Sequence, residues 1–178
     1  LIDVRLQRAA VPSFEQYPFA LDVIRSLHEI RLHSGVTFFV GENGSGKSTL
    51  LEAIAVAWGL NPEGGSRHLQ FDTRQSHSTL HEYLTLSRGV RRARDAFFLR
   101  AESFFNVASE IERLDEEDLP APRIGPAYGP QALHEQSHGE SFLSLLMNRF
   151  RGGGLYILDE PEAALSPSRQ MAALARIH

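Results

Sequence analysis

The chain has 178 residues, of which 42% are hydrophobic and 22% charged, as in ordinary globular proteins with one well-formed core. Its formal net charge of −4 provides no general attraction to nucleic acid or to an anionic membrane, and the absence of cysteine excludes disulfide bonds, a thiolate nucleophile and a cysteine-based metal site. No apolar run approaches the about 20 residues of a membrane helix, and no basic-then-apolar leader begins the chain, so we expect a cytoplasmic protein.

The first part of the chain is predicted to be rich in strands. Residues 4–7 show some alternation, and residues 36–40 form a nearly continuous apolar run. A short run of this kind predicts a strand that is buried on both faces, as in a parallel sheet covered by helices. A glycine-rich turn follows at residues 41–46. A helix comes next, with apolar residues at helical spacing, and Gly59 and Pro62 end it.

The middle of the chain is less regular, and a loop rich in proline and glycine occupies residues 120–130. Its predicted elements are a helix over residues 78–86, a buried strand over residues 96–99 and a helix over residues 107–114.

Regular helices and strands are again predicted towards the end of the chain. A helix is predicted from about residue 139 to 150 and a strand over residues 155–158. Ser166 and Pro167 then begin a last helix, with serine as the N-cap and proline at the first helical position. Because strands and helices alternate at both ends of the chain, we predict an α/β fold with a mainly parallel sheet flanked by helices.

The segment after the first predicted buried strand matches the phosphate-binding loop (P-loop, or Walker A) pattern in full. Its glycines allow successive N–H groups to face phosphate oxygens, and the following helix adds its positive N-terminal end. A plain connecting turn needs one or two glycines and no lysine followed by a hydroxyl, so we predict nucleotide binding. The predicted contacts come from Gly41, Glu42, Asn43, Gly44, Ser45, Gly46, Lys47, Ser48 and Thr49, with Lys47 reaching the β- and γ-phosphates and Ser48 binding Mg²⁺.

Two adjacent carboxylates end the predicted strand at residues 155–158. In P-loop ATPases an acid at this position holds Mg²⁺, and we assign this role to Asp159. Glu160 is then the residue that orients and deprotonates the attacking water. Strand ends often carry polar residues simply because they leave the core, but the P-loop upstream favours the catalytic interpretation.

Three motifs in order resemble one family. Ser137-His138-Gly139-Glu140-Ser141 resembles the ABC signature in its serine-x-glycine-glutamate form, and residues 159–166 resemble the DEPE element and D-loop. The P-loop has the form typical of the same group. Over nearly its whole length the chain is similar to ABC-type P-loop ATPases of the SMC/RecF-like branch, including small bacterial AAA/ABC-like ATPases.

This resemblance implies one ABC-type ATPase domain over residues 1–178. A small helical signature lobe would span about residues 62–150, and the N-terminal portion would be antiparallel. ATP and Mg²⁺ would lie between two copies in a head-to-tail homodimer, where Ser137, Gly139 and Glu140 of one copy face the γ-phosphate bound by the other. An ordinary serine N-cap is the alternative interpretation of this segment.

Departures from the family pattern concern three positions. A glutamine expected at the end of a middle strand is replaced, and Glu102 is our candidate substitute as a metal contact, ahead of Gln70. Ser166 stands where the D-loop usually has aspartate. The switch histidine should follow one more strand after the last helix, so we expect that segment to be absent here, and His178 is not assigned this role.

Several weaker signals remain open. Tyr17 or Phe19 would stack on adenine if they do not pack in the core or a loop. An arginine cluster makes DNA contact an alternative to a solvated helix face. Two histidine pairs at helical spacing could bind a metal but have no obvious third ligand. The arginines are Arg88, Arg91, Arg92, Arg94 and Arg100, and the histidine pairs are His77 with His81 and His134 with His138.

The motifs leave two functions in competition. The first is Mg²⁺-dependent ATP hydrolysis coupled to opening and closing of a dimer, which Glu160 favours. The second is a module that associates on binding ATP with little turnover, for which Ser166 leaves room. A monomeric P-loop GTPase is disfavoured because the chain has no guanine-reading Asn-Lys-x-Asp motif, and a monomeric kinase because it would have no use for residues 137–141.

Overall fold

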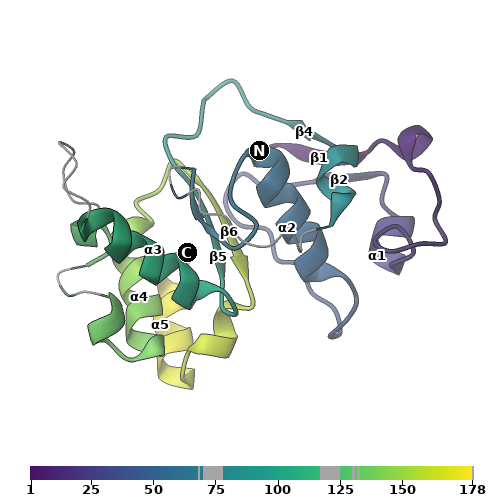
Figure 1. Cartoon of the computed structure of the whole chain (residues 1–178). Coiled ribbons are helices and arrows are strands. Elements are labelled where there is room, and N and C mark those ends of the chain that lie inside the picture. Colours follow the sequence, from purple (N-terminus) through teal and green to yellow (C-terminus); the bar gives the residue numbers. More distant parts are fainter. Residues whose placement is uncertain (68, 70–77, 117–124, 130, 132, 178) are drawn as a thin grey trace.

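The computed structural model describes residues 1–67, 69, 78–116, 125–129, 131 and 133–177. Within these residues the strands form two three-stranded sheets, in the orders β2-β1-β4 and β3-β5-β6, and helices pack around them (Figure 1). The predicted α/β class is therefore confirmed, with the strands divided between two small sheets.

The first sheet is antiparallel throughout. β1 (Asp3–Leu6) lies between β2 (Glu29–Arg31) and β4 (Leu84–Ser87), and Val4 is opposite Ile30 on one side and Leu86 on the other. Val4 and Leu6 are buried whereas Arg5 between them is exposed, as expected for a sheet with one face against the core. This sheet confirms the predicted antiparallel N-terminal portion.

The helix after the phosphate loop packs on this sheet. α2 (Lys47–Trp58) follows the predicted spacing, because Leu50, Ile54 and Trp58 are buried along one side. It ends as predicted at Gly59, whose φ of 97° is left-handed and whose N–H donates to the carbonyls of Ala55 and Val56. The short α1 (Asp22–Arg25) adds Ile24 to the same core.

The second sheet contains the one parallel pair among the described strands. β5 (Ala96–Arg100) runs parallel to β6 (Leu155–Asp159), with Arg100 in register with Asp159, and β3 (Gly65–Ser66) is antiparallel to β5. The carboxyl ends of β5 and β6 therefore meet at one edge, so that polar residues at both strand ends lie close together.

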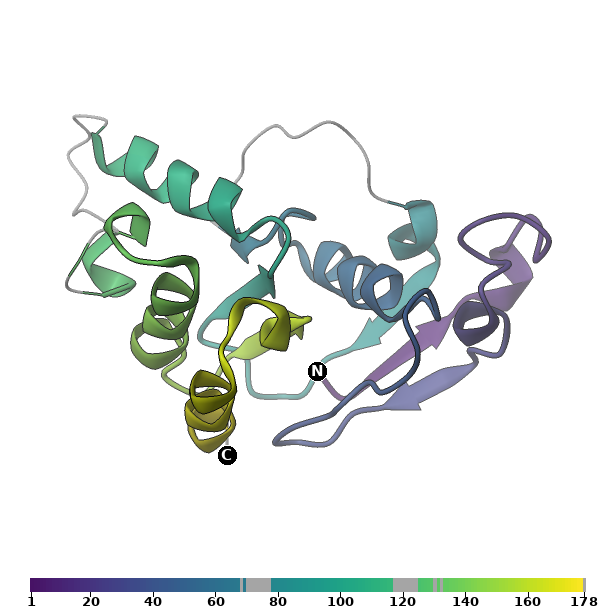
Figure 2. The same ribbon diagram turned by 90° about the horizontal axis from the view of Figure 1, so that it is seen from below.

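β5 is buried on both faces, which explains its continuous apolar sequence. Phe98 packs towards α2, whereas Phe97 and Leu99 pack towards a second core formed with the later helices. Figure 2 shows α2 on one side of β5 and β6 and these helices on the other. They are α3 (Phe104–Glu116), α4 (His138–Arg149) and α5 (Pro167–Ile177).

Short 3₁₀ helices join these elements. They are η1 (Arg8–Ala10), η2 (Thr79–Tyr83), η3 (Gly125–Ala127), η4 (Leu133–Glu135) and η5 (Pro161–Ala164).

Two predicted elements are wrong. Residues 36–40 form no strand, and Phe38 and Val40 are 68% and 92% exposed, because no described strand pairs with this apolar run. Residues 78–86 form no α-helix but η2 followed by β4, where Leu84 and Leu86 alternate with Thr85 and pair with β1. The prediction of a mainly parallel sheet therefore holds only for β5 and β6.

The α-helices described between residues 62 and 150 lie mainly in the second half of this region. α3 and α4 lie there, whereas the first half supplies β4 to one sheet and β5 to the other.

Candidate functional site

The phosphate loop takes a backbone conformation that suits glycine. Gly44 and Gly46 have φ values of 79° and 94°, in the left-handed region. A Cβ on Gly46 would also lie 2.8 Å from Cγ1 of Val23, so this position has no room for a side chain. α2 begins directly afterwards at Lys47, and the N–H groups of a first helical turn have no partner within their own helix.

The Lys47 side chain, at the start of α2, contacts the backbone of the preceding loop. Its Nζ donates hydrogen bonds of 2.8 Å to the backbone oxygens of Gly41 and Glu42. Both acceptors are neutral, so phosphate oxygens could replace them without breaking an ion pair.

The predicted partner of the loop, Asp159, lies directly beside α2. It is the last residue of β6 and only 6% exposed, and its Oδ1 accepts a 2.8 Å hydrogen bond from Oγ of Ser48. Burial raises the pKa of Asp159, against the opposing effects of this hydrogen bond and of the Arg100 charge. A hydroxyl and a carboxylate that meet in this way fit Mg²⁺, which takes few protein ligands and completes its shell with phosphates and water.

Glu160 follows directly after the last residue of β6. It is exposed, and it is the one non-glycine residue of the described chain with a positive φ, 50°. Non-glycine residues in this region are uncommon and cluster at functional sites. The backbone thus turns sharply where the sequence predicts the water-activating carboxylate.

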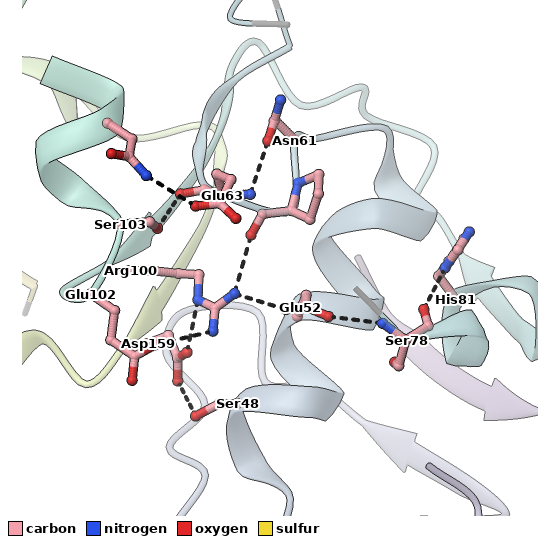
Figure 3. A network of polar contacts seen from close by, with 12 residues as sticks. Ser48, Glu52, Asn61, Glu63, Ser78, His81, Arg100, Glu102, Ser103 and Asp159 are labelled. Carbon is pink, nitrogen blue, oxygen red and sulfur yellow. Dashed lines mark hydrogen bonds and ion pairs between the residues drawn. The ribbon is translucent and has the colours of Figure 1, made fainter. Parts of the chain in front are cut away.

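Arg100 is surrounded by carboxylates at the end of β5 (Figure 3). Its Nη1 lies 2.7 Å from Oε2 of Glu52 and its Nε 3.5 Å from Oδ2 of Asp159, whereas Nη2 is 3.7 Å from Oε2 of Glu102. The Arg100 side chain is only 17% exposed, so its assignment to a basic surface cluster is wrong. Sequence reasoning also missed Glu52, although it lies one helical turn after Ser48 on the same side of α2.

Glu102 stands at the mouth of a cleft beside this network. Its side chain is 80% exposed, and the cleft, of about 440 Å³, is also lined by Tyr17, Ser48, Glu52 and Arg100. The structure thus places Glu102 in the same cleft as the predicted metal ligand Ser48. The runner-up Gln70 lies outside the described residues.

The comparisons with known proteins bear on this arrangement. A family model described as an AAA domain matches residues 17–115, which is more than half of the chain and includes the phosphate loop, α2 and Arg100. The chain belongs to this AAA domain family. A comparison with curated proteins gave no match, and a comparison with solved structures gave none either. The carboxylates at the end of β6 and the signature-like segment lie beyond the matched residues.

A second pocket of the AAA domain lies on the other side of the loop. It also measures about 440 Å³, and Leu21, Val23 and Phe39 line it together with Lys47. No local sequence pattern indicates this pocket, and the prediction for this part of the chain is aromatic stacking by Tyr17 or Phe19 instead. Phe19 cannot stack on a nucleotide here, because it is 4% exposed and packs edge-to-face on Tyr83 at 5.0 Å.

The signature-like segment, which lies outside the residues matched by the AAA family model, begins α4. Ser137 is the N-cap, and its hydroxyl and N–H donate to Oε2 of Glu140 at 2.6 and 3.0 Å. The Glu140 N–H donates to the Ser137 carbonyl, so its predicted use for an anion competes with this bond. Gly139 is tightly packed, since a Cβ there would lie 2.8 Å from the oxygen of Ala164.

The other arginines of the predicted cluster lie on a loop between β4 and β5, not on a helix face. Arg91, Arg92 and Arg94 are exposed there, and Arg88 stacks over Trp58, with Cζ 4.2 Å from the ring centroid. They form a basic surface separate from Arg100.

The histidine pairs receive no support as a metal site. His77 lies outside the described residues, as does His178, and the side chains of His134 and His138 are not described. In the described ranges, no group of three or more His, Asp or Glu side chains is arranged to hold a metal ion.

None of the helices in the described part of the AAA domain has the length and apolar composition that crossing a membrane requires.

Proposed function

We propose that this AAA domain binds ATP with Mg²⁺ and hydrolyses the ATP, as an ABC-type ATPase of the SMC/RecF-like branch. Membership of the AAA domain family supports nucleotide binding. The observation that carries the finer proposal is the 2.8 Å hydrogen bond between Ser48 and Asp159, which joins the start of α2 to the acidic end of β6. These are the two protein groups that P-loop ATPases use for the metal.

Each residue of the site has a role in this proposal. The backbone of residues 41–49 and the Lys47 ammonium hold the phosphates, and Ser48 and Asp159 hold Mg²⁺, which would neutralise phosphate charge. Glu160 accepts a proton from the attacking water and orients it. Glu102 lines the same cleft as Ser48, where its carboxylate would contribute to holding the metal through a water.

A second copy of the chain would complete the site. In the proposed head-to-tail homodimer, Ser137 and the backbone of Gly139 at the start of α4 face the γ-phosphate bound by the partner. Ser137 is exposed, which this contact requires. The Ser137 hydroxyl would exchange Glu140 for phosphate, and Arg169, whose Nη2 lies 2.8 Å from Oε1 of Glu140, would retain that carboxylate.

Exchanging one carboxylate for its amide tests the proposal. We expect Glu160→Gln to lower phosphate release by about 10²–10⁴-fold while ATP binding persists. Sedimentation with and without Mg-ATP should show wild-type dimers that form with ATP and Glu160→Gln dimers that persist. Glu116→Gln, which changes an exposed carboxylate at the end of α3 outside these motifs, is the matched control and should behave as wild type.

The alternatives give different outcomes in the same experiment. ATP-dependent dimers with negligible phosphate release from wild type would identify a binding module instead of an ATPase. ATP binding without dimers, unchanged by Glu160→Gln, would contradict the ABC-type mechanism.

DNA is the alternative partner, because the exposed arginines of the β4–β5 loop offer a surface for phosphates. Adding a short duplex to the sedimentation cell would reveal co-migration that weakens with salt.

A further inference from the structure

One buried guanidinium faces three carboxylates in the cleft beside Asp159. Arg100 carries one positive charge, and Glu52, Asp159 and Glu102 carry up to three negative charges around it (Figure 3). Glu52 and Asp159 are 14% and 7% exposed, so solvent screens these contacts only weakly. The three carboxylates therefore carry more negative charge than Arg100 can neutralise, and the remaining charge attracts a further cation.

Arg100 and Ser48 contact the two oxygens of the same carboxylate. Ser48 donates to Oδ1 of Asp159, and Arg100 lies on the side of Oδ2. A divalent cation bound at Asp159 would stand within a few ångströms of a guanidinium in a poorly screened site. Two like charges at this range repel each other strongly, so metal and guanidinium compete for Asp159.

The two main contacts of Arg100 differ in kind. With Glu52 it makes a 2.7 Å hydrogen bond, and its Nη1 also donates to the Pro62 carbonyl at 3.3 Å. Its Nε has no hydrogen-bond partner, although Oδ2 of Asp159 is 3.5 Å away. Glu52 therefore anchors the guanidinium, and the contact with Asp159 is one of charge alone, which can be given up without losing a hydrogen bond.

We propose that Arg100 is a built-in counter-ion that competes with Mg²⁺ for Asp159, and that Glu52 draws the guanidinium aside when the metal binds. The proposal rests on the proposed function, since it assigns Mg²⁺ to Asp159. Arg100 is a positioning residue here: it sets how strongly the metal couples to nucleotide and does not itself take part in chemistry.

The coupling is measured as the ratio of the ATP dissociation constant in EDTA to that in Mg²⁺. Arg100→Gln should raise this ratio by about tenfold or more, because the competing charge is gone. Arg92→Gln removes the same charge from an exposed loop and should leave the ratio unchanged. An unchanged or smaller ratio in Arg100→Gln would overturn the proposal.

A second variant should change the ratio of ATP dissociation constants in the opposite direction. Glu52→Gln removes the anchor that draws Arg100 aside, so the guanidinium stays at Asp159 and the ratio should fall below that of wild type. A merely structural role of the network would shift both variants in the same direction, and that result would also overturn the proposal. Glu52→Gln keeps the test informative if Arg100→Gln does not fold, because a ratio equal to or above wild type contradicts the proposed anchor.

Binding of Mn²⁺ without nucleotide, followed by electron paramagnetic resonance, separates this proposal from the proposed function. A higher Mn²⁺ affinity of Arg100→Gln than of wild type supports the competition even if ATP binds to neither protein, a result that would refute the ATPase alone. Equal Mn²⁺ affinities together with normal ATP binding would refute the counter-ion and leave the proposed function standing.

Discussion

The two sides of the candidate site are held in place by different means. On the loop side, the structure depends on backbone conformation: Gly44 and Gly46 are left-handed, the loop is exposed, and Lys47 contacts only neutral carbonyls. On the strand-end side, Asp159 and Arg100 are buried in a charged network. The comparison teaches that one side of the site requires backbone conformations open to glycine, whereas the other requires a buried carboxylate beside a guanidinium. Substitutions on the two sides should therefore affect stability differently.

On the loop side, we expect the largest loss of stability from a substitution at Gly46. Gly44→Ala should lower the free energy of unfolding by about 1–2 kcal/mol through its positive φ alone, since nothing lies within 4 Å of an added Cβ. Gly46→Ala should cost about 1 kcal/mol more, because Val23 must also move. Urea denaturation measures both. If the two variants lose the same free energy of unfolding, Val23 moves away from the added methyl group at no cost, which contradicts this prediction.

The strand-end side is tested by removing a buried charge. Burial raises the pKa of Asp159 in the folded chain above its ordinary value of 3.8, so the unfolded chain releases this proton at lower pH. Stability from this group therefore falls as the pH rises from 3.8 to the raised value, and the loss persists at higher pH.

Asp159→Asn should abolish this loss and raise the free energy of unfolding at pH 7 by about 0.5–1 kcal/mol. Arg100 retains its 2.7 Å contact with Glu52 in the variant. Denaturation curves of wild type and variant from pH 4 to 7 provide the measurement. A variant less stable than wild type at pH 7 would mean that the Asp159 charge holds the fold together.

The smallest effect on stability is expected at Lys47. Lys47→Met should change the free energy of unfolding by no more than about 0.5 kcal/mol, because its contacts are with exposed, neutral carbonyls. Nucleotide affinity should nevertheless be lost. A large loss of free energy of unfolding in Lys47→Met, measured by urea denaturation, would show that a charged side chain stabilises the loop side as well.

The sequence allowed the candidate phosphate loop and the helix after it to be predicted, because phosphate binding restricts which residues can serve. Phosphate binding demands glycines and a lysine before a helix, and α2 begins at Lys47 as predicted. The apolar run of β5 indicated a strand buried on both faces, and Phe97 and Phe98 do pack into two different cores.

Other features depend on pairing, which a local pattern does not reveal. The run at residues 36–40 is as apolar as β5, yet no described strand pairs with it. Arg100 follows four other arginines in the sequence, but the parallel register of β5 and β6 places it opposite Asp159. Only knowledge of that register separates a surface arginine from one inside the candidate site.

The tight packing at Gly139 has a mechanical consequence. No side chain separates the start of α4 from the Ala164 carbonyl, and Arg169 on α5 lies as close on the same side. Ala164 ends η5, the short helix that Glu160 caps. The first turn of α4 and the turn at Glu160 are therefore separated by no more than the short helix η5, so a displacement of one would require the other to adjust.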